Sequence, residues 1–470
     1  MPRALTVSSL LLGLALALAP APATAQLDLA SLQDEAVAWL QEYIRVNTIN
    51  PPGNETAGAE FFAAIFDAEG VEYEMAESAP GRGNIWARLE GGDEPGIVLL
   101  HHMDVVPADE RYWSVDPLSG QLTDGYIYGR GALDTKTSGI LHLATFLALH
   151  RTETPLNRDV VFMATADEEA GGFFGAGWLV ENRPEIFDDI GFLLNEGGGG
   201  SDVEGTVNFG LEVTQKVPYW LRLTATGEPG HGSRPLVTYA SVEMIEALER
   251  FRLHSFEPRV IPAVHEHLSG IADRHPEPWR TRFQDMASYV GDPAILLELQ
   301  RYNPGLHALT RNTCSITRFE GSNKINVVSP EVAAEIDCRL LPDQDPDEWL
   351  DEVRAVLGSG IDVEVLMGFT PAVSSTDTGL YRTVREVTLE EFPDAGFVPQ
   401  VVGGFTDSHF FRDLGITSYG YTATATPEDD AGGVHGNDER VTEENVRRGV
   451  AMTLEILERF AATRPITEDH

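Results

Sequence analysis

Acidic and imidazole side chains occur in five short clusters along this chain, three of them directly after a strongly apolar run. The first cluster, HMDVVP, places His102 and Asp104 after the apolar run GIVLL. A histidine that leaves a buried strand can offer a ring nitrogen to a metal ion, and an aspartate two residues later can bind the other ring N–H and fix the tautomer. A strand-end histidine with a capping aspartate explains the same residues, so this cluster alone does not define a metal site.

Two further clusters supply carboxylates. In GRGALDTK, the glycines permit a tight turn that directs Asp134 into a cleft, where its two oxygens can bridge two cations. In DEEAGG, Glu168 and Glu169 directly follow the apolar run DVVFMAT, and adjacent acids at a buried strand end are costly unless they are paired or bind a metal. One acid can then ligate while its neighbour holds a water and acts as general base. A solvated acidic turn is the alternative in a chain with 74 acidic residues.

The last two clusters, NEGG and GVHGN, each add one candidate ligand. If the aspartate of GRGALDTK bridges, each of two metal ions is bound by one histidine, one terminal carboxylate and the shared carboxylate, which leaves positions open for water and substrate. Ligation by nitrogen and oxygen without thiolate favours zinc, with cobalt or manganese as substitutes. The five candidate ligands are His102, Asp134, Glu169, Glu196 and His435.

The pattern of apolar residues predicts the elements that would position these clusters. Short apolar runs are typical of buried strands, and longer amphipathic or Leu- and Ala-rich stretches are typical of helices. Their alternation implies an α/β layer with a largely parallel sheet, and ligands bind at the carboxyl ends of such strands. The predicted strands occupy 96–101, 159–165, 190–194 and 398–402. The predicted helices occupy 31–46, 57–68, 137–150, 378–391 and 442–461.

The middle of the chain has a different pattern. Its predicted strands occupy 219–226, 313–319, 333–340 and 361–366, and its predicted helices occupy 239–253 and 346–357. This order is β-α-β-β-α-β if the stretch 260–310 is an insertion, and such a unit can close its own small sheet. We therefore predict an inserted α+β, ferredoxin-like domain at 213–364, within a catalytic domain formed by 26–212 and 365–470.

The amino-terminal residues predict export. Arg3 precedes an apolar run, and Ala23-Thr24-Ala25 has the pattern of a signal-peptidase site, so residues 1–25 are predicted to be a secretory signal peptide and the protein to be periplasmic or secreted. An uncleaved amino-terminal anchor is the alternative. The formal charge of −41 repels nucleic acid and anionic membranes, so we expect no nucleic-acid partner and no membrane contact after signal cleavage.

The chain has two cysteines, Cys314 and Cys338. This number excludes a disulfide-rich scaffold and a cysteine-rich zinc module. Both cysteines lie in predicted strands of the inserted domain. One disulfide formed in an oxidising compartment and two unpaired buried cysteines are both compatible with the sequence.

In order and spacing, the clusters HMDVVP, GRGALDTK, DEEAGG and NEGG and the late His435 resemble the two-zinc peptidase family of carboxypeptidase G, carboxypeptidase S, aminoacylase, acetylornithine deacetylase and succinyl-diaminopimelate desuccinylase. The resemblance covers nearly all of the mature chain. It implies a mostly parallel α/β di-zinc peptidase domain with an inserted lid or dimerisation domain. It also implies His102 and Glu196 on one zinc ion, Glu169 and His435 on the other, and Asp134 between them.

The resemblance also implies catalytic residues. Glu168 becomes the base that activates water, and Asp104 becomes the partner of His102. The segment GHGSRP resembles the family's lid motif, which implies that His231 reaches the active site of a partner subunit in a homodimer and polarises the scissile carbonyl. A turn residue between two glycines is the structural alternative for His231.

Three residues are implied to contact substrate. Asn326 in INVV resembles a family residue with that role, and a structural role at a strand end is the alternative. The stretch TDSH resembles a family stretch, T-D-x-R, whose arginine binds the substrate carboxylate. This sequence departs from that pattern, because His409 occupies the position and Arg412 follows three residues later. Either side chain could bind the carboxylate.

The sequence therefore predicts a zinc-dependent hydrolase that cleaves an amide bond next to a free carboxylate in small peptides or N-acyl amino acids. We predict an activity like that of a carboxypeptidase or dipeptidase, and an aminoacylase-like deacylase is the alternative within this class. A non-catalytic, metal-stabilised binding protein is the alternative outside it. The pair Glu168 and Glu169 argues against the binding protein, because such a protein needs ligands but no base.

Overall fold

The computed structural model describes residues 27–463, so the predicted signal peptide lies outside the described residues. Its largest sheet has eight strands in the order β1-β2-β6-β3-β7-β16-β8-β15. The neighbours β6, β3, β7 and β16 at its centre run parallel. The strands are β1 (Tyr73–Glu77), β2 (Gly83–Leu89), β3 (Glu94–His102), β6 (Arg158–Thr165), β7 (Ile190–Val203), β8 (Thr206–Gln215), β15 (Gly396–Val402) and β16 (Thr417–Pro427).

Helices cover both faces of this sheet, which explains its continuous apolar strands. In β3, Ile97 and Leu99 belong to one buried core, and Val98 and Leu100 belong to another on the opposite face. The helices on the first face are α1 (Leu29–Arg45), α2 (Glu55–Glu69), α3 (Lys136–Arg151), α11 (Gly379–Glu391) and α14 (Glu443–Ala461). Those on the other face are α4 (Ala176–Asn182) and α12 (Ser408–Asp413). The prediction of a mostly parallel α/β sheet is confirmed. Within residues 27–463, no helix is long and apolar enough to cross a bilayer.

Strand β7 differs from its prediction, which ended at residue 194. The strand continues to Val203, so Glu196 lies inside a strand and not after one. Its glycine run continues the strand, because the backbones of neighbouring strands approach so closely here that only glycine fits. A side chain at Gly198 would clash with the carbonyl oxygens of Gly420 and Gly210.

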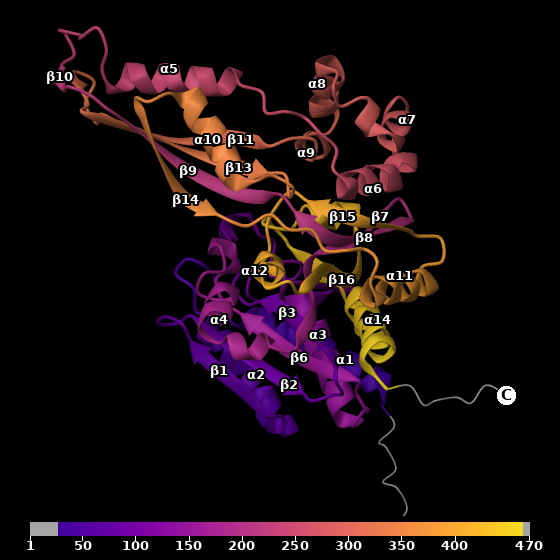
Figure 1. Ribbon diagram of the computed structural model, residues 1–470. Coiled ribbons are helices and arrows are strands. Elements are labelled where there is room, and N and C mark those ends of the chain that lie inside the picture. Colours follow the sequence, from indigo (N-terminus) through magenta and orange to yellow (C-terminus); the bar gives the residue numbers. More distant parts are fainter. Residues whose placement is uncertain (1–26, 464–470) are drawn as a thin grey trace, which may run out of the picture.

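A second sheet forms the lid seen at the top of Figure 1. It has four antiparallel strands in the order β11-β13-β9-β14, with α5 and α10 packed on it. Along the chain, the elements are β9 (Val217–Thr226), α5 (Ala240–Leu253), β11 (Thr313–Glu320), β13 (Glu331–Leu340), α10 (Pro346–Leu357) and β14 (Ile361–Gly368). This is the predicted β-α-β-β-α-β order. Cys314 and Cys338 are opposite one another on β11 and β13 and form a disulfide.

The stretch predicted as an insertion contains four helices between α5 and β11. They are α6 (Pro262–Ile271), α7 (Trp279–Gln284), α8 (Pro293–Tyr302) and α9 (Pro304–Ala308). This helical insertion shares a buried core with Val398 and Val401 of β15, so it covers the edge of the large sheet. The buried Lys216, between β8 and β9, fixes its end by donating to the carbonyl oxygens of Ala308, at 2.8 Å, and Arg311.

Candidate active site

His102, Asp134 and Glu196 lie close together in the structure. His102 is the last residue of β3 and is buried, and Asp134 lies in the loop before α3. The Nε2 atom of His102 is 3.2 Å from Oδ1 of Asp134 and 3.4 Å from Oε1 of Glu196. The three ligand atoms lie within 4.8 Å of one another, which suits one metal ion.

A second group shares Asp134. The Nε2 atom of His435 is 3.1 Å from Oδ2 of Asp134 and 3.2 Å from Oε2 of Glu169. The aspartate therefore presents a different oxygen to each group, as a bridging ligand does. The other oxygen of Glu169, Oε1, is buried and has no hydrogen-bond partner in the described part of the chain, a cost that a cation would remove. The five predicted ligands thus lie together, and their nitrogen and oxygen atoms fit two divalent cations.

Without metal, this cluster binds protons at neutral pH. Burial raises the pKa of Glu196 to about 7. Hydrogen bonds to Asp134 and Glu169 raise the pKa of His435 to about 10. For His102, burial lowers the pKa, but the nearby Glu196 and hydrogen bonds to carboxylates outweigh burial, so the pKa lies well above its usual range. A metal ion must displace these protons in order to bind.

Metal affinity should therefore fall as pH falls. Below the pKa of His435, at about 10, its proton is displaced when a metal binds, His102, whose pKa is also raised, gives up a proton as well, and below about pH 7 Glu196 adds another. Each displaced proton weakens binding about tenfold per pH unit, so the dependence should steepen below neutrality. Chelator competition between pH 6 and pH 9 measures it, and an affinity independent of pH in this range would contradict the proposed ligand set.

Glu168 lies beside the ligand group of His102 and belongs to neither ligand group. Its Oε2 atom is 3.9 Å from Nε2 of His102. Burial, followed by repulsion from Glu196, raises the pKa of Glu168 well above its usual range. A carboxylate with a high proton affinity at the edge of a metal site is placed to take a proton from water.

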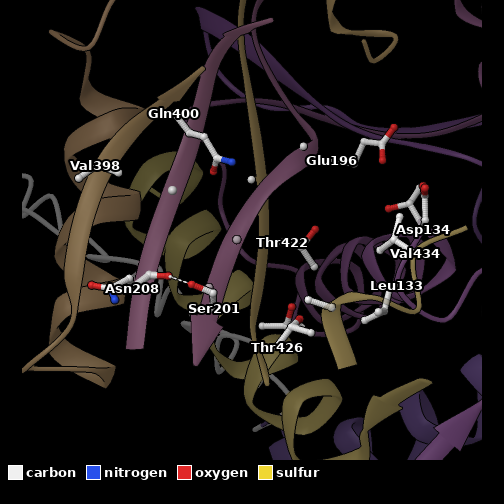
Figure 2. Close-up of a pocket in the computed structure, with 18 of the residues that line it drawn as sticks. Leu133, Asp134, Glu196, Ser201, Asn208, Val398, Gln400, Thr422, Thr426 and Val434 are labelled. Atoms are coloured by element: carbon white, nitrogen blue, oxygen red, sulfur yellow. Dashed lines mark hydrogen bonds between the residues drawn. The ribbon is translucent and has the colours of Figure 1, made fainter. Parts of the chain in front are cut away.

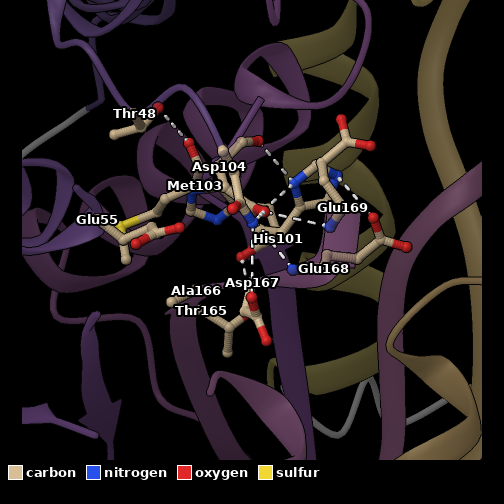
Figure 3. Close-up of polar contacts among 12 residues, drawn as sticks. Thr48, Glu55, His101, Met103, Asp104, Thr165, Ala166, Asp167, Glu168 and Glu169 are labelled. Carbon is tan, nitrogen blue, oxygen red and sulfur yellow. Dashed lines mark hydrogen bonds and ion pairs between the residues drawn. The ribbon is translucent and has the colours of Figure 1, made fainter. Parts of the chain in front are cut away.

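Asp104 connects the ends of β3 and β6 through hydrogen bonds drawn in Figure 3. Its carboxylate accepts from the main-chain N–H groups of Glu168, at 3.0 Å, and Glu169, at 3.1 Å, and from Nδ2 of Asn50, at 2.8 Å. We predicted that this carboxylate fixes the tautomer of His102. The structure differs, because Nδ1 of His102 is 2.9 Å from the carbonyl oxygen of Asp104 and 3.5 Å from its carboxylate. The carbonyl orients the histidine, and the carboxylate holds the loop that carries the base.

Glu439 is a positioning residue that was not predicted from the sequence. Its side chain is fully buried, and its carboxylate accepts hydrogen bonds from the main-chain N–H groups of Gly131, Leu133 and Asp134 at 3.0, 2.7 and 3.0 Å. These bonds fix the loop that presents Asp134 to both ligand groups. In the sequence, an acid in GNDE is indistinguishable from a solvated loop residue.

Arg130 joins this loop to the loop of His435. One of its nitrogens donates to Glu439 at 2.6 Å, and another donates to the carbonyl oxygen of Gly436 at 2.6 Å. One buried network therefore holds the loops of Asp134 and His435.

The variant Glu439→Gln should weaken both metal sites together. The amide would place an N–H group among N–H donors and remove the charge that strengthens these bonds. Losing such a supporting residue typically costs roughly 10- to 100-fold in metal affinity. Chelator competition measures both dissociation constants, and Glu444→Gln, an exposed acid on α14, is the matched control. If both metal dissociation constants are unchanged in Glu439→Gln, Glu439 does not position the metal ligands.

Arg412 is not available to bind a substrate carboxylate. It is buried, and Nη2 donates to both carboxylate oxygens of Glu212 at 2.9 and 2.7 Å. The same nitrogen donates to the carbonyl oxygen of Ser418 at 2.8 Å. The structure therefore gives no support to the prediction that Arg412 holds the substrate carboxylate, because a buried acid already pairs with it.

His409 lies in an aromatic stack. Its ring centre is 3.6 Å from that of Phe369 and 3.8 Å from that of Phe410. Burial lowers the pKa of His409 to about 3, so the ring is neutral at physiological pH. A neutral, stacked imidazole cannot supply a charged clamp, and the structure gives no support to a carboxylate-binding role that titrates near neutral pH.

His231 and Asn326 lie together at the tip of the lid, outside both ligand groups of their own chain. Strand β10 (Gly230–His231) pairs with β12 (Val327–Val328), and the N–H of Gly232 donates to the carbonyl oxygen of Asn326 at 2.9 Å. Figure 1 shows β10 at the far end of the lid, away from the large sheet. Both side chains are exposed.

Two ligand groups that share a carboxylate, with a candidate carboxylate base nearby, are typical of the active site of a metal-dependent hydrolase. More specifically, the chain belongs to the peptidase family M20/M25/M40, whose family model matches residues 98–459. This membership confirms the predictions of a metal-binding hydrolase that acts on amide bonds.

Individual relatives cover most of the chain. The N-fatty-acyl-amino acid synthase/hydrolase of Xenopus tropicalis is 29% identical, over 90% of this chain and 85% of its own length. Human aminoacylase-1 is 26% identical, over 92% of this chain and 97% of its own. Among solved structures, the M20 metallo-carboxypeptidase Sso-CP2 of Sulfolobus solfataricus has the same fold, with a TM-score of 0.70 at 20% identity over 91% of this chain and 99% of that chain.

Proposed function

We propose that this protein hydrolyses the amide bond of N-acyl amino acids with two zinc ions per chain, and that cobalt or manganese can replace zinc. The observation that carries the proposal is the carboxylate of Asp134, whose two oxygens face two ligand groups with Glu168 beside them. The name of the Xenopus relative specifies N-fatty-acyl amino acids, which favours deacylation. Cleavage of small peptides is the second candidate, in keeping with membership of a peptidase family.

The chain's own residues would move the protons of this reaction. When bound, the zinc ions would polarise the scissile carbonyl and make a nearby water more acidic. Glu168 would accept a proton from the attacking water and deliver it to the nitrogen of the leaving amine. Asp104 would keep this base in position through the N–H groups of Glu168 and Glu169. The products are a free carboxylic acid and a free amine.

The lid supports a proposal of catalysis across a homodimer. The N–H of Ser233 donates to Nδ1 of His231 at 3.2 Å, so the proton of the neutral ring lies on Nε2 and can be donated to a carbonyl oxygen. Ile325 and Val237 are fully exposed apolar residues of the lid, as expected of a surface that meets a partner. We propose that His231 acts in the active site of the partner subunit.

Export is part of the proposal. The apolar amino-terminal run and the small-x-small site at residues 23–25 support a cleaved signal peptide. The disulfide between Cys314 and Cys338 is in keeping with an oxidising compartment, periplasmic or extracellular.

A substrate screen tests the proposal. The protein is stripped of metal, reloaded with zinc and incubated with a pool of N-acyl amino acids and dipeptides, and mass spectrometry follows each compound. We expect the wild-type protein to consume acyl amino acids and release free amino acids. The Glu168→Gln variant should consume almost none of them. Consumption of dipeptides alone would favour the peptidase form. No consumption by protein that binds two zinc ions would favour a non-catalytic binding protein.

A further inference from the structure

A cavity of about 520 Å³ extends from the metal ligands along the large sheet. It begins at Asp134 and Glu196 and follows β7 as far as Ser201 (Figure 2). Strands β8, β15 and β16, the helical insertion and the loops that carry Asp134 and His435 supply most of its other lining residues. We call this cavity the strand pocket. Because it opens directly beside the ligand carboxylates, a substrate held at the metals can extend into it.

Strand β7 gives the length of the strand pocket. Glu196 and Ser201 are five residues apart on one strand, and a strand rises about 3.3 Å per residue, so the two ends are roughly 17 Å apart. Asn208 pairs with Ser201 and marks the same far end, which Figure 2 shows well separated from Asp134 and Glu196. A group bound at the far end is therefore remote from the scissile bond.

The walls of the strand pocket combine apolar and hydrogen-bonding groups. Ile271 and Val398 are apolar, whereas Gln400 and Asn208 offer amide groups. A plain hydrocarbon tail would leave these polar groups without partners. The lining therefore fits an extended chain that carries polar atoms towards its far end.

Arg274 supplies a positive charge at that end. Arg274 is the last residue of the short helix Ala272–Arg274, which follows α6. A Cβ atom added to Gly396 would lie 2.7 Å from Nη2 of Arg274 and close to the side chain of Asn208, so the two side chains lie at the same end of the strand pocket. Among the described residues, Arg274 forms no ion pair, and the adjacent Asp273 lies towards Arg280 at 3.9 Å. An exposed arginine without a carboxylate partner, in a chain with 74 acidic residues, is a ready binding group for an anion.

We propose that the strand pocket binds the acyl part of the substrate and that Arg274 binds a carboxylate at the far end of that acyl chain. The substrate class is an amino acid acylated by a long chain with a terminal carboxylate, either a dicarboxylic acyl chain or a peptide segment with an acidic end. This inference rests on the proposed function and specifies its substrate. Arg274 determines specificity and takes no part in the bond cleavage itself.

The test compares two substrate series on the zinc-loaded protein. Both are N-acyl amino acids of increasing chain length, one with methyl ends and one with carboxylate ends. A hydrogen-bonded charged group contributes about 1.5–3 kcal/mol, so kcat/KM should favour the carboxylate end by roughly 10- to 100-fold once the chain spans the strand pocket. Arg274→Ala should bring this ratio close to one. Arg301→Ala, an exposed arginine of the same insertion, should keep it. Peptides of matched length with an acidic end distinguish the two sources of the carboxylate.

Failure of this inference is distinguishable from failure of the proposed function. If short acyl amino acids are cleaved but the ratio does not change in Arg274→Ala, the assignment of Arg274 is overturned and the proposed function stands. If no amide is cleaved, calorimetry can still measure the affinity of the zinc-loaded protein for the same two series, which tests binding in the strand pocket. Tighter binding of the carboxylate series that depends on Arg274 supports the inference, and equal affinities overturn it.

Discussion

Replacing Glu168 by glutamine is expected to abolish nearly all turnover while both metal ions stay bound. Glu168 belongs to neither ligand group, and its main-chain N–H still donates to Asp104 in the variant. The amide keeps the shape of the side chain but cannot accept a proton from water. Loss of a general base typically lowers kcat by roughly 10²–10⁴-fold. The measurement is kcat and metal content on the same sample.

The matched control is Glu181→Gln, an exposed acid in α4 that should leave kcat and metal content as they were. A near-normal kcat in Glu168→Gln with two metals bound would show that another group takes the proton. Loss of metal from Glu168→Gln would instead make Glu168 a ligand.

Replacing Asp134 by alanine should empty both metal sites. Its Oδ1 faces the group of His102 and its Oδ2 faces the group of His435, so one substitution removes a ligand from each. A side chain that served one ion would have a smaller effect. Glu196→Ala provides the comparison, because that carboxylate belongs to one group only.

Elemental analysis after dialysis against a weak chelator measures this difference. We expect close to no metal in Asp134→Ala and about one ion per chain in Glu196→Ala. Two ions retained per chain in Asp134→Ala would contradict the bridging role.

The fold was predictable where both faces of a strand are covered by helices. The runs GIVLL and DVVFMAT are apolar because the side chains of residues 97–100 and 160–164 alternate between two cores, so their strands were predictable. Strand β16 was not predicted, although it lies beside β7 near the middle of the sheet. Its sequence, TSYGYTATATP, alternates threonine with alanine and tyrosine and has no continuous apolar run. Its position depends on strand pairing that local sequence does not encode.

The grouping of the five candidate ligands was predictable because their residue types, order and spacing carry the chemistry. The supporting residues were not, because their roles depend on contacts between distant segments. Glu439 reaches a loop about 300 residues earlier in the chain, and Arg412 pairs with Glu212, 200 residues away. Without such contacts, the sequence left Arg412 as a candidate to bind substrate and did not single out Glu439.

Titration of the metal-free protein with zinc, followed by binding and by hydrolysis in the same sample, tests the central claim most directly. The claim is that two ions joined by Asp134 form one catalytic centre. The account predicts no hydrolysis without metal, and activity that reaches its plateau at two zinc ions per chain. A plateau at one ion per chain, or full activity without metal, would contradict it.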